Sequence, residues 1–327
     1  MPNEIKILRR KLLHDNFLFI DGMSKSGKIV ISSIISTLKN CENQLYTGQF
    51  NNYLKFSNLN LMEENLAVDL ILQEMQILMI ENHLARFLNF RKHDLSSVNN
   101  SLKKKTYYDR LKIKDNPNEI KKIINNLKKN KDLIPLIVDD FFPSCKAKFK
   151  YFYRFKKIIM LRNPVGILYE NLKRSRLDKQ IKGHPWQKMF YYKKNSFKVP
   201  WFVNSKYVNK FFSSTRIEKY LMFMNSEYQP YLNQNVFKIK NTLYLFLEDI
   251  WENPKQGVKL ISKFLKKNPT NHTKKILKAL DLPRRNAKKN YEKQYYYLKN
   301  VMKKSEFKII LDMEKSYLNR KKTYGFK

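Results

Sequence analysis

A glycine-flanked basic loop near the start of the chain constrains the fold more than any other feature. Residues 17–20 are apolar, Gly22 and Gly27 stand at the GxxxxGK spacing, and a helical pattern begins at Lys28. This succession predicts a strand, a phosphate-binding loop and a helix whose first backbone N–H groups surround a phosphate. Ile29 occupies the position where a nucleotide triphosphatase has Ser or Thr to hold magnesium. The loop therefore indicates a phosphate group more strongly than it indicates ATP.

Apolar runs and helical patterns alternate along the rest of the chain. Strands are predicted at residues 16–21, 133–138, 157–161 and 241–247, and helices at residues 28–39, 62–90, 215–224 and 254–265. Asn163 and Pro164 together make a strong helix start, since Asn caps a helix and Pro fits its first turn. The alternation predicts an α/β fold, a three-layer sandwich with a mostly parallel central sheet.

The sequence shows no internal repeat, and we expect one domain over residues 1–327. Residues 177–214 are rich in Lys, Tyr, Phe and Trp without a clean period, which predicts irregular structure, a lid or an acceptor-site insertion. Residues 284–327 read as a basic loop followed by a helical region.

The charge balance favours anionic partners. Lys and Arg number 66 against 28 Asp and Glu, a net charge of +38, which attracts nucleotides, acidic glycans, nucleic acid or anionic membranes. Lys, Asn, Ile, Tyr and Phe are all abundant and Gly is scarce, so an AT-rich genome explains the excess equally well. Whether the charge is functional stays open at this point.

Composition also argues against several classes of protein. The chain has two cysteines, Cys41 and Cys145, outside any Cys/His grouping, which favours neither a disulfide framework nor a zinc site and suggests a reducing compartment. No run reaches the roughly 18 apolar residues of a membrane span, and the apolar run at residues 17–20 is too short for a signal peptide. We therefore expect a cytoplasmic protein without a transmembrane segment.

Three segments resemble the PAPS-dependent sulfotransferases. Residues 22–27, GMSKSG, match the family's loop G-x-[PS]-[KR]-S-G-[TS], with Lys28 where Thr is usual. Residues 158–164, IIMLRNP, are similar to the strand and Arg-Asn-Pro that open its 3′-phosphate site. Residues 247–254, LEDIWENP, continuing to 263–265, KFL, resemble its late YEDL…P…FL segment. The resemblance implies a P-loop NTPase-like sulfotransferase fold and transfer of a sulfuryl group from 3′-phosphoadenylyl sulfate (PAPS) to a hydroxyl, without a metal.

The resemblance also implies roles for individual residues. Lys25 would neutralise the leaving phosphate, as magnesium does in phosphoryl transfer, and Arg162 would pair with the 3′-phosphate. Arg284 and Arg285 stand where some members bring a basic loop over that phosphate. The family often has Ser where this chain has Glu170, whose charge would repel the phosphate unless it points elsewhere, or Ser175 or the basic loop takes over, or the site is altered. The residues expected to hold the 5′-phosphosulfate are Gly22, Ser24, Lys25, Ser26, Gly27, Lys28 and Ile29.

The acceptor hydroxyl needs a base. Asp140 is the first candidate, because Asp140 and Pro143 resemble the DKxP of some members, although Phe141 replaces the Lys. Asp139, His83 and His93 are the alternatives. The acceptor could be a glycan, a lipid headgroup, a small alcohol or a protein tyrosine, and the charge favours an anionic glycan.

Two other functions compete with this interpretation. A P-loop kinase or NTPase would use residues 22–28 for phosphates and Asp139 or Asp140 for magnesium, but Ile29 argues against it. A basic nucleic-acid-binding protein would track phosphates with its Lys-rich helices and stack bases on Tyr and Phe. Its aromatic residues fall mostly on apolar faces, and no recognised binding module is present, so this function is disfavoured.

Overall fold

The computed structural model describes residues 12–46, 50–138, 152, 154–182, 191–233, 239–284 and 286–326. Within these residues the core is a five-stranded sheet in the order β2-β3-β1-β4-β7, and every pairing in it is parallel. The expected α/β fold with a mostly parallel central sheet is thus confirmed. The strands are β1 Leu18–Asp21, β2 Cys41–Tyr46, β3 Ile134–Val138, β4 Lys156–Leu161 and β7 Thr242–Phe246.

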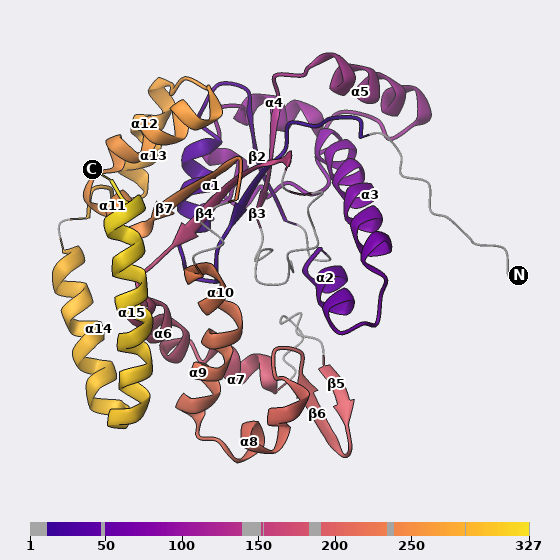
Figure 1. Ribbon diagram of the computed structural model, residues 1–327. Helices are drawn as coiled ribbons and strands as arrows, with labels where there is room; N and C mark the ends of the chain where they lie inside the picture. The colour runs from indigo at the N-terminus through magenta and orange to yellow at the C-terminus, as the bar shows by residue number, and fades with distance from the viewer. Residues whose placement is uncertain are drawn as a thin grey trace, which may run out of the picture.

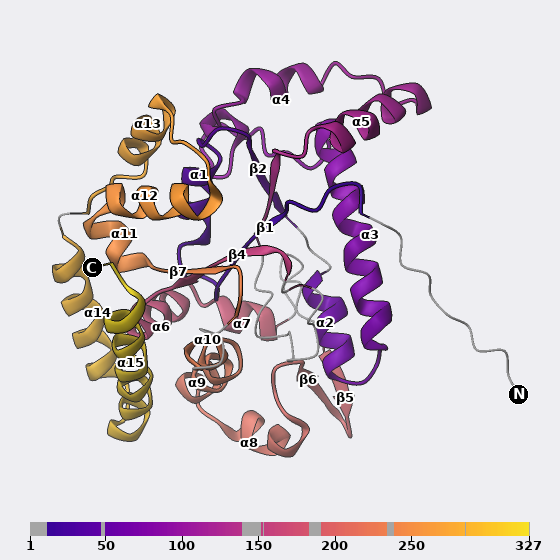
Figure 2. The ribbon, with the colours of Figure 1, turned by 45° about the horizontal axis from the view of Figure 1, so that its top comes forward.

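Helices cover both faces of this sheet (Figures 1 and 2). Alternate residues of a strand point to opposite faces, so Leu18 and Ile20 pack with α1, α12 and α13, whereas Phe17 and Phe19 pack with α2, α3 and α5. Beyond β1, the second face continues under α6, α9 and α15, which pack on Ile159 and Leu161 of β4. These helices are α1 Lys28–Ile35, α2 Phe50–Asn58, α3 Glu64–His83, α5 Pro117–Lys129, α6 Pro164–Lys173, α9 Arg216–Glu227, α12 Pro254–Leu265, α13 Asn271–Ala279 and α15 Lys304–Tyr324.

The remaining elements lie around this sandwich. In Figure 1, α14 and α15 run side by side along the left edge, and the hairpin of β5 and β6 lies at the lower right, below α2. Residues 177–214 were expected to be irregular, and where they are described this expectation is wrong, because they form most of α7, then β5, β6 and α8. These elements are α4 Lys104–Arg110, α7 Arg176–Ile181, β5 Tyr191–Lys194, β6 Phe197–Pro200, α8 Val208–Ser213, α10 Gln229–Leu232, α11 Leu247–Glu252 and α14 Ala287–Val301.

Local capping fixes where several helices begin. The Asn163 side chain accepts a hydrogen bond from the N–H of Val165, with Pro164 in the first turn, as the sequence predicts. Thr215 and Glu218 form a capping box at the start of α9. The helix expected over residues 62–90 is shorter, since α3 ends at His83 and Ala85 turns left-handed with φ 60°. The helix expected at residues 28–39 likewise ends at Ile35.

The strand β2 escapes sequence analysis because its middle residues are polar. Glu42 is nevertheless buried, at 2% exposure, and its carboxylate accepts hydrogen bonds from Arg110 (3.1 and 3.2 Å), Lys103 (3.0 Å) and the Tyr107 hydroxyl (2.8 Å). Burial by itself raises the pKa of Glu42, but the charges of Arg110 and Lys103 outweigh it and hold the pKa well below its usual range. This network fastens the edge strand to α4.

We predict that Glu42→Gln lowers the free energy of unfolding by about 3–5 kcal/mol, because it leaves Arg110 buried without its counter-charge. Urea unfolding followed by circular dichroism measures the change. Asp109→Asn is the matched control: its ion pair with Lys112 is exposed and should be worth at most about 1 kcal/mol. Equal losses in the two variants would contradict a special role for the buried network.

Candidate functional site

The loop between β1 and α1 has a left-handed backbone that two glycines make accessible. Gly22 has φ 143°, Lys25 φ 75° and Gly27 φ 100°. Residues that carry a Cβ rarely adopt such angles. A Cβ at Gly22 would lie 2.4 Å from the carbonyl oxygen of Met160, and one at Gly27 would lie 2.5 Å from Cδ1 of Leu247. The loop is therefore packed directly against the end of β4 and the start of α11.

Side chains at both ends hold this loop. Asp21 is buried, and its Oδ1 accepts hydrogen bonds from the N–H of Gly22 (2.6 Å) and the hydroxyl of Tyr231 (2.7 Å), which belongs to α10. The Lys28 ammonium donates to the carbonyl of Gly22 and so joins the two ends of the loop. Sequence analysis did not single out Asp21, although an acid at the end of an apolar run and directly before Gly22 was a visible signal.

The inner side of the loop presents hydrogen-bond donors. Gly27 caps α1 without a side chain, so no capping side-chain oxygen satisfies the first N–H groups of the helix. Ser26 is fully buried, and its hydroxyl has no hydrogen-bond partner among the described residues. Uncapped N–H groups at a helix N-terminus together with a buried hydroxyl favour an anion at this place.

Arg162 connects this loop to a cavity. Its Nη1 donates to the carbonyl oxygen of Lys25 at 3.1 Å, and its guanidinium lies 5.4 Å from the ring centre of Trp251. A Cβ at Gly166 would lie 2.9 Å from Nε of Arg162, so this glycine leaves the room that the side chain occupies. Burial lowers the pKa of Arg162, which Glu248 and Glu170 partly offset. Nε of Arg162 is buried, and no hydrogen-bond partner for it lies in the described part of the chain.

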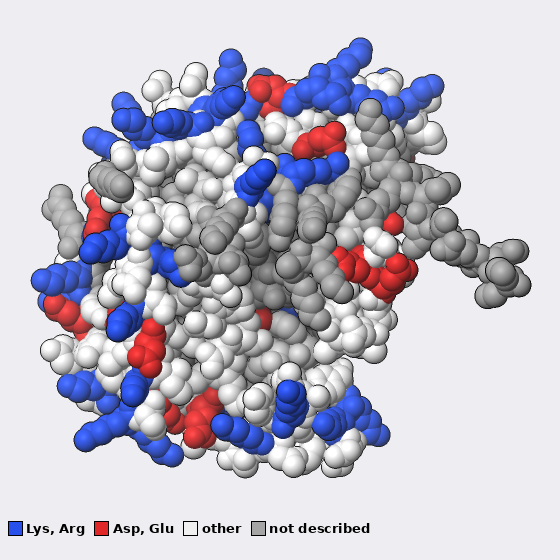
Figure 3. All heavy atoms as spheres, viewed as in Figure 1, with Lys and Arg blue, Asp and Glu red and all other residues white. Residues whose placement is uncertain are grey.

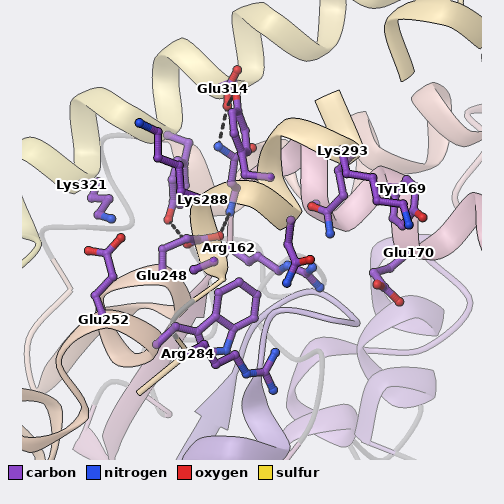
Figure 4. Close-up of a pocket in the computed structure, with 18 of the residues that line it drawn as sticks. Arg162, Tyr169, Glu170, Glu248, Glu252, Arg284, Lys288, Lys293, Glu314 and Lys321 are labelled. Atoms are coloured by element: carbon purple, nitrogen blue, oxygen red, sulfur yellow. Dashed lines mark hydrogen bonds between the residues drawn. The ribbon is translucent and has the colours of Figure 1, made fainter. Parts of the chain in front are cut away.

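The cavity on the far side of Arg162 has a volume of about 620 Å³ and lies between α6, α11, α14 and α15 (Figure 4). Arg284 belongs to its wall: its N–H donates to the carbonyl of Trp251 at 2.8 Å, and its guanidinium lies 4.7 Å from the same Trp251 ring. Two guanidinium groups thus contact one indole, whose Nε1 is buried without a partner among the described residues.

The carboxylates of the cavity wall fall into two groups. Glu248 accepts from the N–H of Asn163 (3.0 Å) and the hydroxyl of Tyr317, and Glu314 accepts from the hydroxyl of Tyr291 (2.9 Å) and the Asn163 side chain. These two carboxylates hold α6 to α11 and α15 through neutral donors. Glu170, also in the wall, differs from them because its partner is charged: it forms an ion pair with Nε of Arg174 at 3.3 Å.

The structure describes the three residues behind the alternatives that Glu170 raised: Glu170 itself, Ser175 and Arg284. Glu170 and Arg162 line the same cavity. Ser175 is not part of that wall, and its hydroxyl accepts from Arg216 at 3.1 Å. Arg284, from the downstream basic loop, is part of the wall (Figure 4).

The structure brings some predicted residues together and separates others. The loop, Arg162 and residues 247–251 are in mutual contact, but the described wall of the cavity contains no residue of the loop, Lys25 included. Asp139, Asp140 and Arg285 lie outside the described residues, so their placement stays a prediction.

The structure separates His83, one of the two histidines considered as bases, from the loop. His83 lies next to the Glu42 network: its Nδ1 is 2.9 Å from the carbonyl of Met79 and its Nε2 is 3.4 Å from Arg110. Glu42 is at the start of β2, because its neighbour Cys41 pairs with the first residue of β3. The loop follows the other, carboxyl end of the parallel strand β1. His83 is therefore at the opposite end of the sheet from the loop. His93 is exposed in a turn and does not line the cavity.

No protein-family model and no curated protein matches this chain. In the described part of the chain, three or more His, Cys, Asp or Glu side chains nowhere gather in a way that could hold a metal ion. Among the same residues, none of the helices combines the length and the apolar character needed to cross a membrane.

We predict that His83 makes the stability of the fold depend on pH. Burial, and then the charge of Arg110, lowers the pKa of His83 from 6.5 to about 4. As the pH falls, His83 therefore becomes protonated in the unfolded chain before it does in the folded protein. Its contribution to the free energy of unfolding is fully present above pH 6.5 and is lost as the pH drops towards 4. Denaturant unfolding at pH 7 and pH 4.5 should show that His83→Gln removes about 1–2 kcal/mol of this loss.

His14 shares the same direction, because burial lowers its pKa as well. A slope that survives in His83→Gln and disappears in His14→Gln would assign the whole effect to His14 and contradict the prediction. His93→Gln, at an exposed turn, is the control and should retain the wild-type slope.

Proposed function

We propose that this protein is a sulfotransferase that moves a sulfuryl group from PAPS to an acceptor hydroxyl, on a P-loop NTPase-like sulfotransferase fold. One observation carries the proposal. Segments that lie more than 80 residues apart in the sequence converge on Arg162, which contacts both the Lys25 carbonyl of the loop and the Trp251 ring. These are the three segments that resemble the family, and their order along the sheet supports a shared site.

The geometry suits a ligand with two anionic groups. PAPS carries a phosphosulfate at its 5′ position and a phosphate at its 3′ position. The loop, with the uncapped α1 N-terminus and the Ser26 hydroxyl, would hold the 5′ group. Arg162 and Arg284, both against Trp251, would hold the 3′-phosphate, since a guanidinium fork pairs well with phosphate.

The buried donors at the site fit such a ligand. The Ser26 hydroxyl and Nε of Arg162 are buried without partners among the described residues, and leaving a buried donor unpaired costs about 1–3 kcal/mol. Glu248 and Glu314 accept hydrogen bonds from neutral donors, and in the described part of the chain neither forms an ion pair with Arg162 or Arg284. An anion would satisfy the donors and remove this cost.

The reaction requires little covalent chemistry from the protein. The acceptor oxygen forms a bond to sulfur as the bond from sulfur to the 5′-phosphate oxygen breaks, and the hydroxyl proton passes to a base. The leaving phosphate gains charge, which the ammonium of Lys25 and the N–H groups at the start of α1 would stabilise. Asp140 is the proposed base. A sulfuryl donor needs no magnesium on the loop, which is compatible with Ile29.

Calorimetric titration with adenosine 3′,5′-bisphosphate, the product of PAPS, tests this proposal. We expect the wild-type protein to bind it without added metal, and Lys25→Ala and Arg284→Ala each to bind it at least about 10-fold more weakly, because each removes a charged hydrogen-bond donor. Arg284 is the cleaner probe, since its side chain is exposed and its contact with Trp251 through the N–H is retained. Arg91→Ala removes an exposed charge elsewhere and should bind as wild type.

The competing functions give different results in the same titration. Absence of bisphosphate binding, or binding indifferent to Lys25 and Arg284, contradicts the proposal. Binding of ATP that requires magnesium supports a P-loop kinase or NTPase instead. Binding of single-stranded DNA that bisphosphate does not displace, and that falls steeply with salt, supports a nucleic-acid-binding protein.

A substitution at Glu170 should strengthen the binding of the bisphosphate, whereas those at Lys25 and Arg284 should weaken it. Its carboxylate lines the cavity of Arg162, so a phosphate there is repelled by it, and Glu170→Gln should raise the affinity for the bisphosphate about 3- to 10-fold. Glu292→Gln is the matched control, because Glu292 is an exposed residue of α14 outside the described wall. Unchanged or weaker binding to Glu170→Gln would place the 3′-phosphate elsewhere.

A further inference from the structure

A second cavity lies beside the β5–β6 hairpin. Its volume is about 1040 Å³, and its described wall comes from α2, from β5 and the segment after β6, and from α8 and α9. Figures 1 and 2 both show α2 beside β5 and β6, although more than 130 residues separate them in the sequence. The cavity therefore lies between two parts of the chain, and none of its described residues belongs to the cavity of Arg162.

Aromatic residues line this cavity: Tyr192, Trp201, Phe202 and Tyr207 belong to its described wall. Trp201 lies edge to face with Phe202, with ring centres 6.3 Å apart, and Tyr207 is 52% exposed. Tyr192 is held by a hydrogen bond from its hydroxyl to the carbonyl of Val203 at 2.7 Å. Lys55 lies 3.9 Å from the centre of the Trp201 ring, which joins α2 to the segment after β6. The rings are thus partly fixed before any ligand binds.

The charge of the wall has one sign. Lys55 and Lys210 line the cavity, and no Asp or Glu does so among the described residues. The hairpin beside it adds Lys194, which donates to the carbonyl of Ser205 at 2.8 Å, and Lys198, which lies over the ring of Tyr191. In Figure 3 the lower right of the molecule carries basic side chains, whereas acidic ones lie among the basic ones towards the lower left. The cavity of Arg162, in contrast, has basic side chains and four Glu in its wall, so the second cavity differs in having no carboxylate among its described residues to oppose an anion.

The other polar groups of the wall are neutral amides and hydroxyls, from Asn58, Asn204, Asn225, Ser205 and Ser226. A sugar presents hydroxyls at its edge and C–H groups on its faces, which pack against the electron-rich face of an aromatic ring. A fatty chain would leave the amides without partners, and a single tyrosine side chain would fill a small part of about 1040 Å³. Rings, amides and lysines in one wall match a sugar that carries carboxylate or sulfate groups.

We infer that this second cavity binds an anionic oligosaccharide, which supplies the acceptor hydroxyl. The inference rests on the proposed sulfotransferase function for its catalytic meaning, but the binding of the sugar is a separate property of the cavity. The lysines select the anionic chain, and Trp201 and Tyr207 provide the surface on which its rings pack.

Titration calorimetry with a hyaluronan tetrasaccharide, in about 0.15 M salt to screen non-specific attraction, tests the inference. We expect binding, and at least about 10-fold weaker binding to Trp201→Ala, as for an aromatic residue at the centre of an interface. Lys210→Ala should lose about 3-fold and also part of the preference over neutral maltotetraose. The matched controls, Tyr296→Ala and Lys128→Ala, remove an exposed ring and an exposed charge far from the cavity wall and should stay within about 2-fold of wild type.

The results separate the failure of this inference from the failure of the proposed function. Equal binding to wild type, Trp201→Ala and the controls, or equal binding of maltotetraose, overturns the inference, and so does absence of binding. The bisphosphate titration of the same wild-type protein reports on the nucleotide site alone, so either result can fail while the other holds. Trp201→Ala should bind the bisphosphate as wild type does; if it does not fold, Tyr207→Ala, at an exposed ring of the same wall, takes its place with the same expected direction.

Discussion

The contact between the Arg162 guanidinium and the Lys25 carbonyl is the interaction on which the site depends. It joins the end of β4 to the loop after β1, and Trp251 and Gly166 fix the guanidinium on its other sides. Arg162 forms no ion pair with a carboxylate among the described residues, and burying an arginine in this way is costly. Burial is also the main reason why the pKa of Arg162 is lowered. Among the described residues Nε of Arg162 also has no hydrogen-bond partner, so packing within this part of the chain does not offset the cost of burying the side chain. Because the same side chain also supports the loop, its removal would disturb both parts of the site together.

Glycine placement leads to the same region. The chain has seven glycines in 327 residues, and three of them, Gly22, Gly27 and Gly166, stand where a Cβ would collide with groups that belong to the site or pack on it. Gly22 makes room for β4, Gly27 for Leu247 and Gly166 for Arg162 itself. A compositional bias that makes glycine scarce does not explain why it remains at these positions. Close packing around the loop does.

How far the sequence predicts the structure depends on which forces leave a local pattern. β1 and β3 are buried on both faces and read as continuous apolar runs, and the caps of α6 and α9 need only neighbouring residues. β2 was missed because Glu42 is satisfied by residues more than 60 positions away. The loop and Arg162 were predicted from short motifs, whereas the cavity wall from α14 and α15 depends on packing that no local pattern encodes. The hairpin β5–β6 was missed for a related reason, since its strands are only half-buried and lack a buried face of regular period.

The net charge of +38 does not by itself identify a binding site, because the two cavities differ in how basic and acidic side chains are distributed in their walls. In the cavity of Arg162, basic side chains share the wall with four Glu, and two of these, Glu248 and Glu314, are hydrogen-bond acceptors that fasten helices together. Selectivity for an anion there depends on geometry, because attraction and repulsion are both present at short range. In the second cavity the described wall has lysines and no carboxylate, so attraction acts without local opposition and aromatic and amide groups must provide the selection. A donor nucleotide with fixed anionic groups suits the first arrangement, and an anionic chain of variable sequence suits the second.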